Sequence, residues 1–170
     1  IRPKTHGLSL DYPGWQPLAR ALNERRSLIL VPLAELGDDY AQARRFCGIF
    51  ADCPVVLAGA SWGQWRLAAA LMEACPNLHM EFHLFQANRA VEYFAERFGA
   101  RRLLFGSGLP RHSAGAARGF VDWSLLPDGA LADFAGGNLR RLLGEGPAAA
   151  PAVPAETDDL ARAARAGGAV

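Results

Sequence analysis

The chain has 170 residues, of which 51% are hydrophobic and 21% are charged, and its formal net charge is +1. This length suits one domain with a buried core, since domains commonly have about 100–150 residues. The composition is that of a soluble globular protein. A net charge so close to zero gives no electrostatic reason to expect a nucleic acid or a membrane surface as a partner.

The cysteines and the absence of a recognisable targeting signal indicate the cellular compartment that we expect for the protein. The three cysteines, at positions 47, 53 and 75, fit no zinc-binding or redox spacing. Cys47 and Cys75 fall on apolar faces of predicted helices, where they serve as small hydrophobic residues. No stretch approaches the length of a membrane-spanning helix, and the chain does not start with a signal peptide. We therefore expect a cytoplasmic protein in a reducing compartment.

The first third of the chain alternates helical and strand patterns. Apolar residues at helical spacing predict a helix from Trp15 to Leu22, with Asp11 as its candidate N-terminal cap. The aliphatic run 28–31 predicts a buried strand. A second helical stripe covers 40–50, and the run 55–58 predicts a second strand.

The same alternation continues in the middle of the chain. Helical spacing of apolar residues predicts helices over 65–72 and 87–98, and Gly99 is a suitable stop for the second of them. The apolar runs 78–82 and 103–105 predict two further strands. Aromatic residues at this helical spacing are typical of a hydrophobic core, so they are no evidence of a cofactor site.

Strand and helix recur at a period of roughly 25 residues, which predicts an α/β fold with crossover connections. An open doubly wound sheet also satisfies this pattern, but no Gly-x-Gly-x-x-Gly follows any strand. After residue 146 the composition turns to alanine, proline and glycine. We therefore expect one domain over 1–146 and a disordered tail over 147–170, with a frayed helix near 158–165.

Two segments carry a resemblance to a known family. The last predicted strand continues into Phe105-Gly106-Ser107-Gly108, and a helical segment follows that closes with residues 136–144. This pattern resembles the end of the amidohydrolase-related, metal-dependent hydrolase family, whose eighth barrel strand ends in Phe-Gly-Ser-Asp. Residues 76–81 are similar to the entry of the family's seventh strand. The resemblance spans 1–144 and implies the C-terminal portion, about strands 4–8, of a (β/α)8 TIM barrel.

The family's chemistry depends on metal ligands at the mouth of the barrel. Members use one or two divalent metals to activate water for hydrolysis, or for decarboxylation or hydration, of small and often carboxylated substrates. Here the positions that correspond to three of the ligands carry residues without donor side chains: Pro32 or Leu33, Gly59 and Gly108. A zinc site needs three or four nitrogen, sulfur or oxygen ligands. We therefore expect no family-type metal among these residues and assign no cofactor.

Polar residues on the third strand are the candidates for metal-free chemistry. Strand alternation places His79, Glu81 and His83 on the inner face, with His83 nearest the mouth. Glu81 could orient a histidine as a general base or hold the substrate, and the alternative is a buried polar network without catalysis. Glu35, in a loop after the first strand, is a third catalytic candidate, and the alternative there is a solvated loop carboxylate.

Four other residues are candidates for binding the substrate: His6, Trp62, Ser107 and Arg111. Arg111 follows the last strand directly and is a suitable clamp for a carboxylate or phosphate, although an exposed basic loop is an equal alternative. Trp62 is placed to line a pocket, and Ser107 is small enough to permit close approach of a ligand. Ser61 lacks a Gly-x-Ser-x-Gly context and is a poor candidate nucleophile.

Three hypotheses remain open at this point. The first is a barrel of this family that has a degenerate metal site and binds a small, carboxylated molecule, with acid–base chemistry from His83, Glu81 and Glu35. The second is an active metal-dependent hydrolase or decarboxylase with ligands from upstream of Ile1. The third is a non-catalytic binding or scaffold barrel. Because unpaired strand edges promote association, we also expect the isolated segment either to associate into homo-oligomers or to fold poorly.

Overall fold

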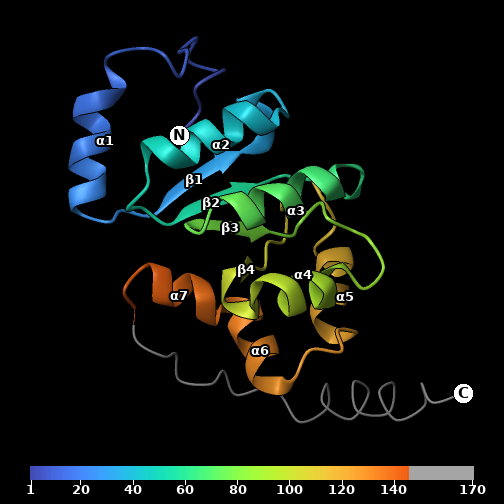
Figure 1. Cartoon of the computed structure of the whole chain (residues 1–170). Coiled ribbons are helices and arrows are strands. Elements are labelled where there is room, and N and C mark those ends of the chain that lie inside the picture. Colours follow the sequence, from blue (N-terminus) through green and yellow to red (C-terminus); the bar gives the residue numbers. More distant parts are fainter. Residues whose placement is uncertain (146–170) are drawn as a thin grey trace, which may run out of the picture.

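The protein forms one parallel sheet with helices on its flanks, as seen in a computed structural model that describes residues 1–145. The strands are β1 (Ile29–Pro32), β2 (Val55–Ala58), β3 (Leu78–Glu81) and β4 (Leu103–Leu104), in the order β1-β2-β3-β4. The connecting helices are α2 (Tyr40–Ile49), α3 (Trp65–Ala74) and α4 (Ala90–Phe98), preceded by α1 (Trp15–Glu24). The predicted α/β class is confirmed, and the arrangement fits part of a (β/α)8 barrel (Figure 1).

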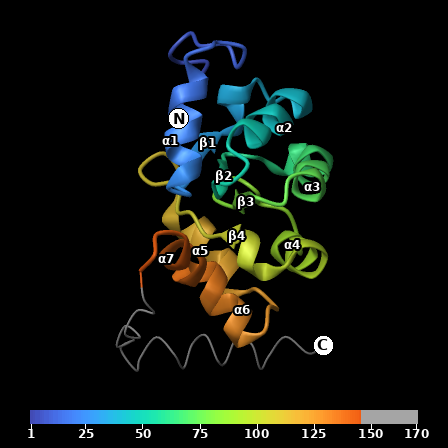
Figure 2. The ribbon, with the colours of Figure 1, turned by 60° about the vertical axis from the view of Figure 1, so that its left-hand side comes forward.

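Alternation along the strands separates two faces of the sheet. Val31, Leu57, Met80 and Leu103 pair in register across all four strands and are almost fully buried. This row belongs to the main hydrophobic core, and α2, α3 and α4 line one side of the strands in the same order (Figure 2). His79, by contrast, pairs with Val56 on the other face, as strand alternation predicts.

The strand ends differ by one or two residues from the predicted ones. β1 starts at Ile29 and includes Pro32, while β3 stops at Glu81 and leaves Phe82 just beyond it. Phe82 remains in the core and stacks edge-on against Phe85 and Phe94, so its burial does not depend on strand pairing. Such shifts are expected, because an apolar run marks burial and not the hydrogen bonds that end a strand.

The start of the first helix corrects the prediction for Asp11. Gly14 precedes α1, and no side chain caps it. The Asp11 carboxylate instead pairs with Arg45 of α2, and the hydrogen bond from this guanidinium is the main cause that lowers the pKa of Asp11. Trp15 anchors the helix by packing edge-on against Phe50, at 6.2 Å between ring centroids.

Left-handed backbone geometry delays the start of α4. The helix was predicted from residue 87, but Arg89 has φ +57° and therefore cannot lie inside a right-handed helix. The helix then runs from Ala90 to Phe98, and Gly99 ends it with φ +89°, as predicted.

The C-terminal region forms several short helices where the sequence suggested a single terminal one. They are α5 (Ala114–Asp122), α6 (Asp128–Ala132), a kinked turn η4 (Asp133–Gly137), in which Gly136 leaves helical geometry, and α7 (Asn138–Leu142). Short 3-10 segments, η1 (Leu33–Leu36), η2 (Trp62–Gln64) and η3 (Ala100–Arg102), complete the described elements. Pro127 precedes α6 and ends the possibility of a continuous helix, since proline disfavours helical geometry in the residue before it.

None of the helices in the described range is long and apolar enough to cross a membrane. The predicted tail over 147–170, with its frayed helix, lies outside the described residues.

Candidate functional site

A pocket of about 540 Å³ lies where the carboxyl ends of the four strands meet. Pro32 and Ala58 are the last residues of β1 and β2, while His83 and Gly108 follow β3 and β4. All four line this pocket, together with Arg2 and residues of the loop after β4. Because ligand sites of parallel α/β folds lie at this end of the strands, the pocket, called the mouth below, is the candidate site.

Glu81 and His83 form a hydrogen-bonded pair at the mouth. The backbone N–H of His83 donates to Glu81 Oε1 at 2.8 Å, and His83 Nδ1 contacts Glu81 Oε2. Both side chains are mostly buried, with 11% of the Glu81 side chain and 19% of the His83 side chain exposed. A carboxylate accepts only, so Nδ1 carries the proton in the neutral ring and Nε2 keeps its lone pair.

The free edge of the His83 ring is directed into the mouth. A Cβ atom at Gly59 would lie 3.9 Å from His83 Cε1, and one at Gly108 would lie 2.9 Å from His83 Cδ2. Because Nε2 sits between Cε1 and Cδ2, it faces the space between these two glycines. Both glycines have positive φ, +73° and +67°, which also favours the absence of a side chain.

Gly106 makes room for the carboxylate of this pair. A Cβ at this position would overlap Glu81 Oε1 and lie 2.5 Å from Glu81 Cδ. A larger residue would therefore displace Glu81 from His83. Gly106 thus leaves space for the Glu81–His83 pair, and Gly108 lies beside the imidazole of that pair.

Basic residues gather around the same mouth. Arg2, Arg111 and His112 line it with His83, and no acidic residue is among the lining residues. The His83 and His112 rings lie 5.5 Å apart between centroids. Among residues 1–145, neither arginine forms an ion pair with a carboxylate. The mouth is therefore suited to an anionic ligand.

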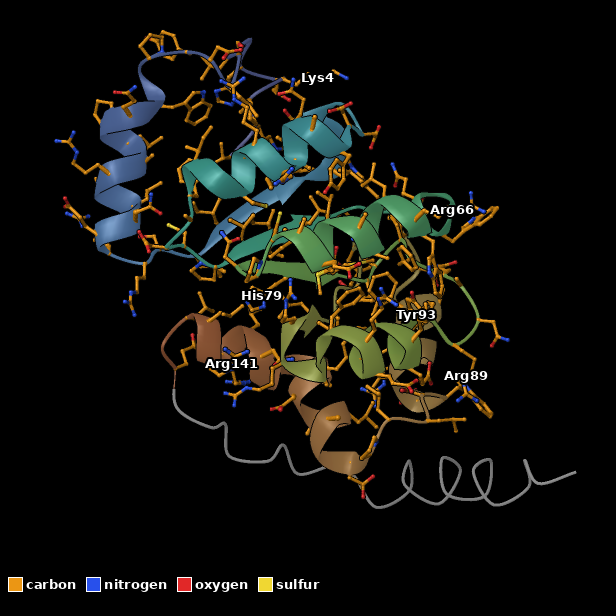
Figure 3. All side chains as sticks on the ribbon, viewed as in Figure 1. Lys4, Arg66, His79, Arg89, Tyr93 and Arg141 are labelled. Carbon is orange, nitrogen blue, oxygen red and sulfur yellow. The ribbon has the colours of Figure 1, made fainter. Side chains whose placement is uncertain are left out.

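The third polar residue of β3 lies at the other end of the strand. His79 is 8% exposed and lies near Arg141 of α7 (Figure 3), and it is not among the residues that line the mouth. Its Nδ1 has no hydrogen-bond partner among the described residues. Burial, followed by the charges of Arg102 and Arg141, lowers the pKa of His79 from 6.5 to about 4. His79 is thus a neutral residue below the site, and among the described residues it forms no hydrogen bond with Glu81 or His83.

Glu35 is at the same end of the sheet but does not join the pair. Its carboxylate accepts hydrogen bonds from the backbone and the hydroxyl of Thr5, and these bonds lower its pKa. It lines a separate depression beside Lys4. We therefore leave Glu35 out of the acid–base set.

The other predicted binding residues fall in different places. Arg111 lines the mouth. Ser107 is beside it, but its hydroxyl accepts a hydrogen bond from the Leu109 backbone N–H at 3.3 Å. Trp62 is 67% exposed at the start of η2, and His6 is exposed in the N-terminal turn; neither lines the mouth.

Three residues that help to build the mouth were not predicted as site residues from the sequence: His112, Gly106 and Arg2. His112 had a signal, because it follows Arg111 in the same loop, whereas Gly106 looked like one more small residue of a motif. Arg2 had none, because the N-terminal segment reaches the β1 side through contacts that no sequence pattern predicts: the Ile1 nitrogen donates to the Leu30 carbonyl at 2.7 Å, and Thr5 donates to Glu35.

The positions that the resemblance assigns to metal ligands do meet in space. Pro32, Gly59 and Gly108 all line the mouth, yet none offers a donor side chain. His83 has one nitrogen occupied by Glu81, which leaves His83 and His112 with imidazole donors there. Within the described part of the chain, no group of three or more His, Cys, Asp or Glu residues could hold a metal ion. These residues therefore do not fit a family-type metal centre.

Comparison with known proteins supports the resemblance. A family model described as Amidohydrolase matches residues 38–144, which is more than half of the chain and includes β2, β3, β4 and the loop after β4. No curated protein matches the chain, and no solved structure matches it. By its match over 38–144, this chain belongs to the amidohydrolase family.

Proposed function

We propose that the protein binds a small carboxylated molecule at the mouth of its sheet and acts on it by metal-free acid–base chemistry, in the manner of a hydrolase. The observation that carries this proposal is the Glu81–His83 pair, whose free nitrogen faces the space between Gly59 and Gly108. Family membership supports the reaction class, because amidohydrolases are hydrolases.

His83 is the proposed general base. Its Nε2 takes a proton from a water molecule or from the substrate, and Glu81 stabilises the positive imidazolium that results. The carboxylate also holds the ring in one orientation through two contacts, one to the backbone N–H and one to Nδ1 of His83. General-base catalysis of this kind typically contributes about 100- to 10,000-fold to a rate.

Arg111 is the proposed holder of the substrate carboxylate. Arg111 lines the mouth and forms no ion pair with a carboxylate among the described residues. A planar guanidinium matches a carboxylate with two parallel hydrogen bonds, which fixes the orientation of the ligand as well as its position.

The test is turnover of the purified protein on a panel of small carboxylated amides, esters and β-keto or aromatic acids, followed by NMR. We expect His83→Gln and Glu81→Gln each to lower kcat by about 100-fold or more, because each removes part of the base. Gly106→Ala should act in the same direction by displacing Glu81. Glu73→Gln, on an exposed ion pair with Arg97, is the matched control and should leave kcat unchanged.

Metal analysis separates this proposal from the family's usual chemistry. We expect less than one equivalent of zinc, manganese or iron per chain, and turnover that survives a chelator. One tightly bound equivalent that is lost together with activity in His83→Ala would instead support an active metal-dependent hydrolase. Carboxylate binding through Arg111 without turnover on any substrate would support a non-catalytic binding barrel.

A further inference from the structure

The two arginines of the mouth come from opposite edges of the sheet. The backbone nitrogen of Ile1 donates to the Leu30 carbonyl of β1 at 2.7 Å, so Arg2 enters the mouth on the β1 side. Arg111 enters from the loop after β4, where its backbone N–H donates to the Gly108 carbonyl at 3.0 Å. β1 and β4 are the two ends of the strand order.

His112 strengthens the β4 side. Its backbone N–H also donates to the Gly108 carbonyl, at 3.0 Å, so the same turn holds Arg111 and His112. A neutral imidazole offers one N–H donor and a charged one offers two. The β4 side therefore provides a guanidinium and an imidazole for one anionic group.

The backbone segments that carry Arg2 and Arg111 stand at the two ends of the strand order. Parallel strands lie about 4.8 Å apart, so β1 and β4 are separated by roughly 14 Å along the sheet, less where the sheet curves. The two side chains therefore approach the mouth from opposite sides, and each can hold an anionic group on its own side of the His83 ring. The ring of His83, which follows β3, lies between the two edges.

We propose that the mouth selects elongated ligands with two separated anionic groups, one bound by Arg2 and the other by Arg111 and His112. The middle of such a ligand lies against His83 Nε2, where a bond between the two anionic ends is within reach of the base. This inference rests on the proposed function, because it uses the same mouth and the same Arg111, and it adds Arg2 as a residue that determines specificity.

The charges around Arg2 agree with this role. Glu35 is an acidic residue whose charge interacts with that of Arg2, and among the described residues the two do not form an ion pair. The Glu35 oxygens already accept hydrogen bonds from Thr5, so they do not neutralise the guanidinium by direct contact. Arg2 is thus available to an anionic group that reaches the β1 side.

The experiment is calorimetric titration of the whole chain with a series of straight-chain dicarboxylates, from malonate to adipate, and with the monomethyl ester of each. The ester removes one charge and keeps the length. We expect one length of diacid to bind about tenfold or more tightly than its ester, because a second guanidinium contact is gained. Inorganic phosphate, which carries two charges on one centre, should bind no better than an ester.

Two variants test which arginine binds which anionic group of the ligand. Arg2→Gln should abolish the preference for the diacid and leave ester binding unchanged, while Arg111→Gln should weaken the diacid and the ester alike. Arg118→Gln, which removes an exposed arginine paired with Asp122 of α5, is the control and should change neither. Each titration is repeated on two independent preparations after far-UV circular dichroism has shown the same folded signal.

Three results would overturn the inference, and they differ in what they say about the proposed function. If esters bind through Arg111 but no diacid gains affinity, the two-ended mouth is wrong and carboxylate binding stands. If phosphate binds better than every diacid, the mouth takes one compact dianion and not two separated groups. If no carboxylate binds, both proposals fail.

Discussion

At the residue scale, His79 couples the protonation of a buried side chain to folding. It is 8% exposed on β3, and burial together with the charges of Arg102 and Arg141 lowers its pKa to about 4. The unfolded chain binds a proton at His79 near pH 6.5, whereas the folded protein does so only near pH 4. The stability from His79 is therefore complete above about pH 6.5 and is lost as the pH falls toward about 4.

Urea unfolding at about pH 7.5 and about pH 5 tests this coupling. We expect the free energy of unfolding of the wild type to fall by about 2 kcal/mol more over this interval than that of His79→Gln, since the variant cannot titrate at this position. His6, His83 and His112 are present in both proteins, so their contributions cancel in the comparison. Equal losses in the two proteins would show that His79 is not held neutral.

At the element scale, β4 shows how a two-residue edge strand is protected. The Leu104 carbonyl accepts from Phe82 N–H on the β3 side, so the backbone groups of Leu103 and Phe105 face the open edge. Asn138, at 0% exposure, donates to the Leu103 carbonyl at 2.9 Å, and the Phe134 carbonyl accepts from Phe105 N–H at 3.1 Å. The Asn138 side chain and the Phe134 carbonyl thus satisfy the backbone groups that a neighbouring strand would otherwise pair with.

Asn138→Ala should lower the free energy of unfolding by about 2 to 3 kcal/mol, because Asn138 also donates to the Ala100 carbonyl and two acceptors would lose their donor. Leu139→Ala, at the next position of α7, is the control: Leu139 is 41% exposed, and its loss should cost less than about 1 kcal/mol. Denaturant titration measures both. If Asn138→Ala lowered the free energy of unfolding less than Leu139→Ala, Asn138 would not protect the edge of β4.

Elements with a strong apolar period could be predicted from the sequence, and those set by single backbone angles could not. The run 55–58 is β2 as predicted, and helical stripes marked α2 and α3 to within two residues. The start of α4 was wrong because it depends on the positive φ of Arg89, and the C-terminal helices were merged because their breaks follow from local turns.

The site was predictable only along a single strand. The alternation of side chains along a strand predicted that Glu81 and His83 share one face, but it placed His79 there too. Alternation identifies the face of a residue and does not show which end of the strand faces the ligand site. The gathering of Arg2 with Arg111 depends on contacts between segments more than 100 residues apart, which no local pattern encodes.

At the scale of the whole molecule, the two edges of the sheet are unequal. The edge of β4 is covered by Asn138 and Phe134, whereas on the outer edge of β1 the Leu30 carbonyl meets only the Ile1 nitrogen among the described residues. Leu30 also leaves 52% of its surface exposed on the sheet face opposite the main core. An uncovered strand edge beside an exposed leucine favours pairing with another chain.

We therefore expect this 170-residue segment, purified on its own, to self-associate through β1, with a weight-average mass in sedimentation velocity that rises with concentration. Leu30→Glu should shift the equilibrium toward monomer, because a charge at the edge strand opposes pairing. Leu125→Glu is the matched control, since Leu125 is 65% exposed in the segment between α5 and α6 and away from either strand edge. A wild type that stays monomeric at every concentration, or a Leu125 variant with the larger effect, would contradict association through β1 and shift attention to the exposed leucines of the C-terminal helices.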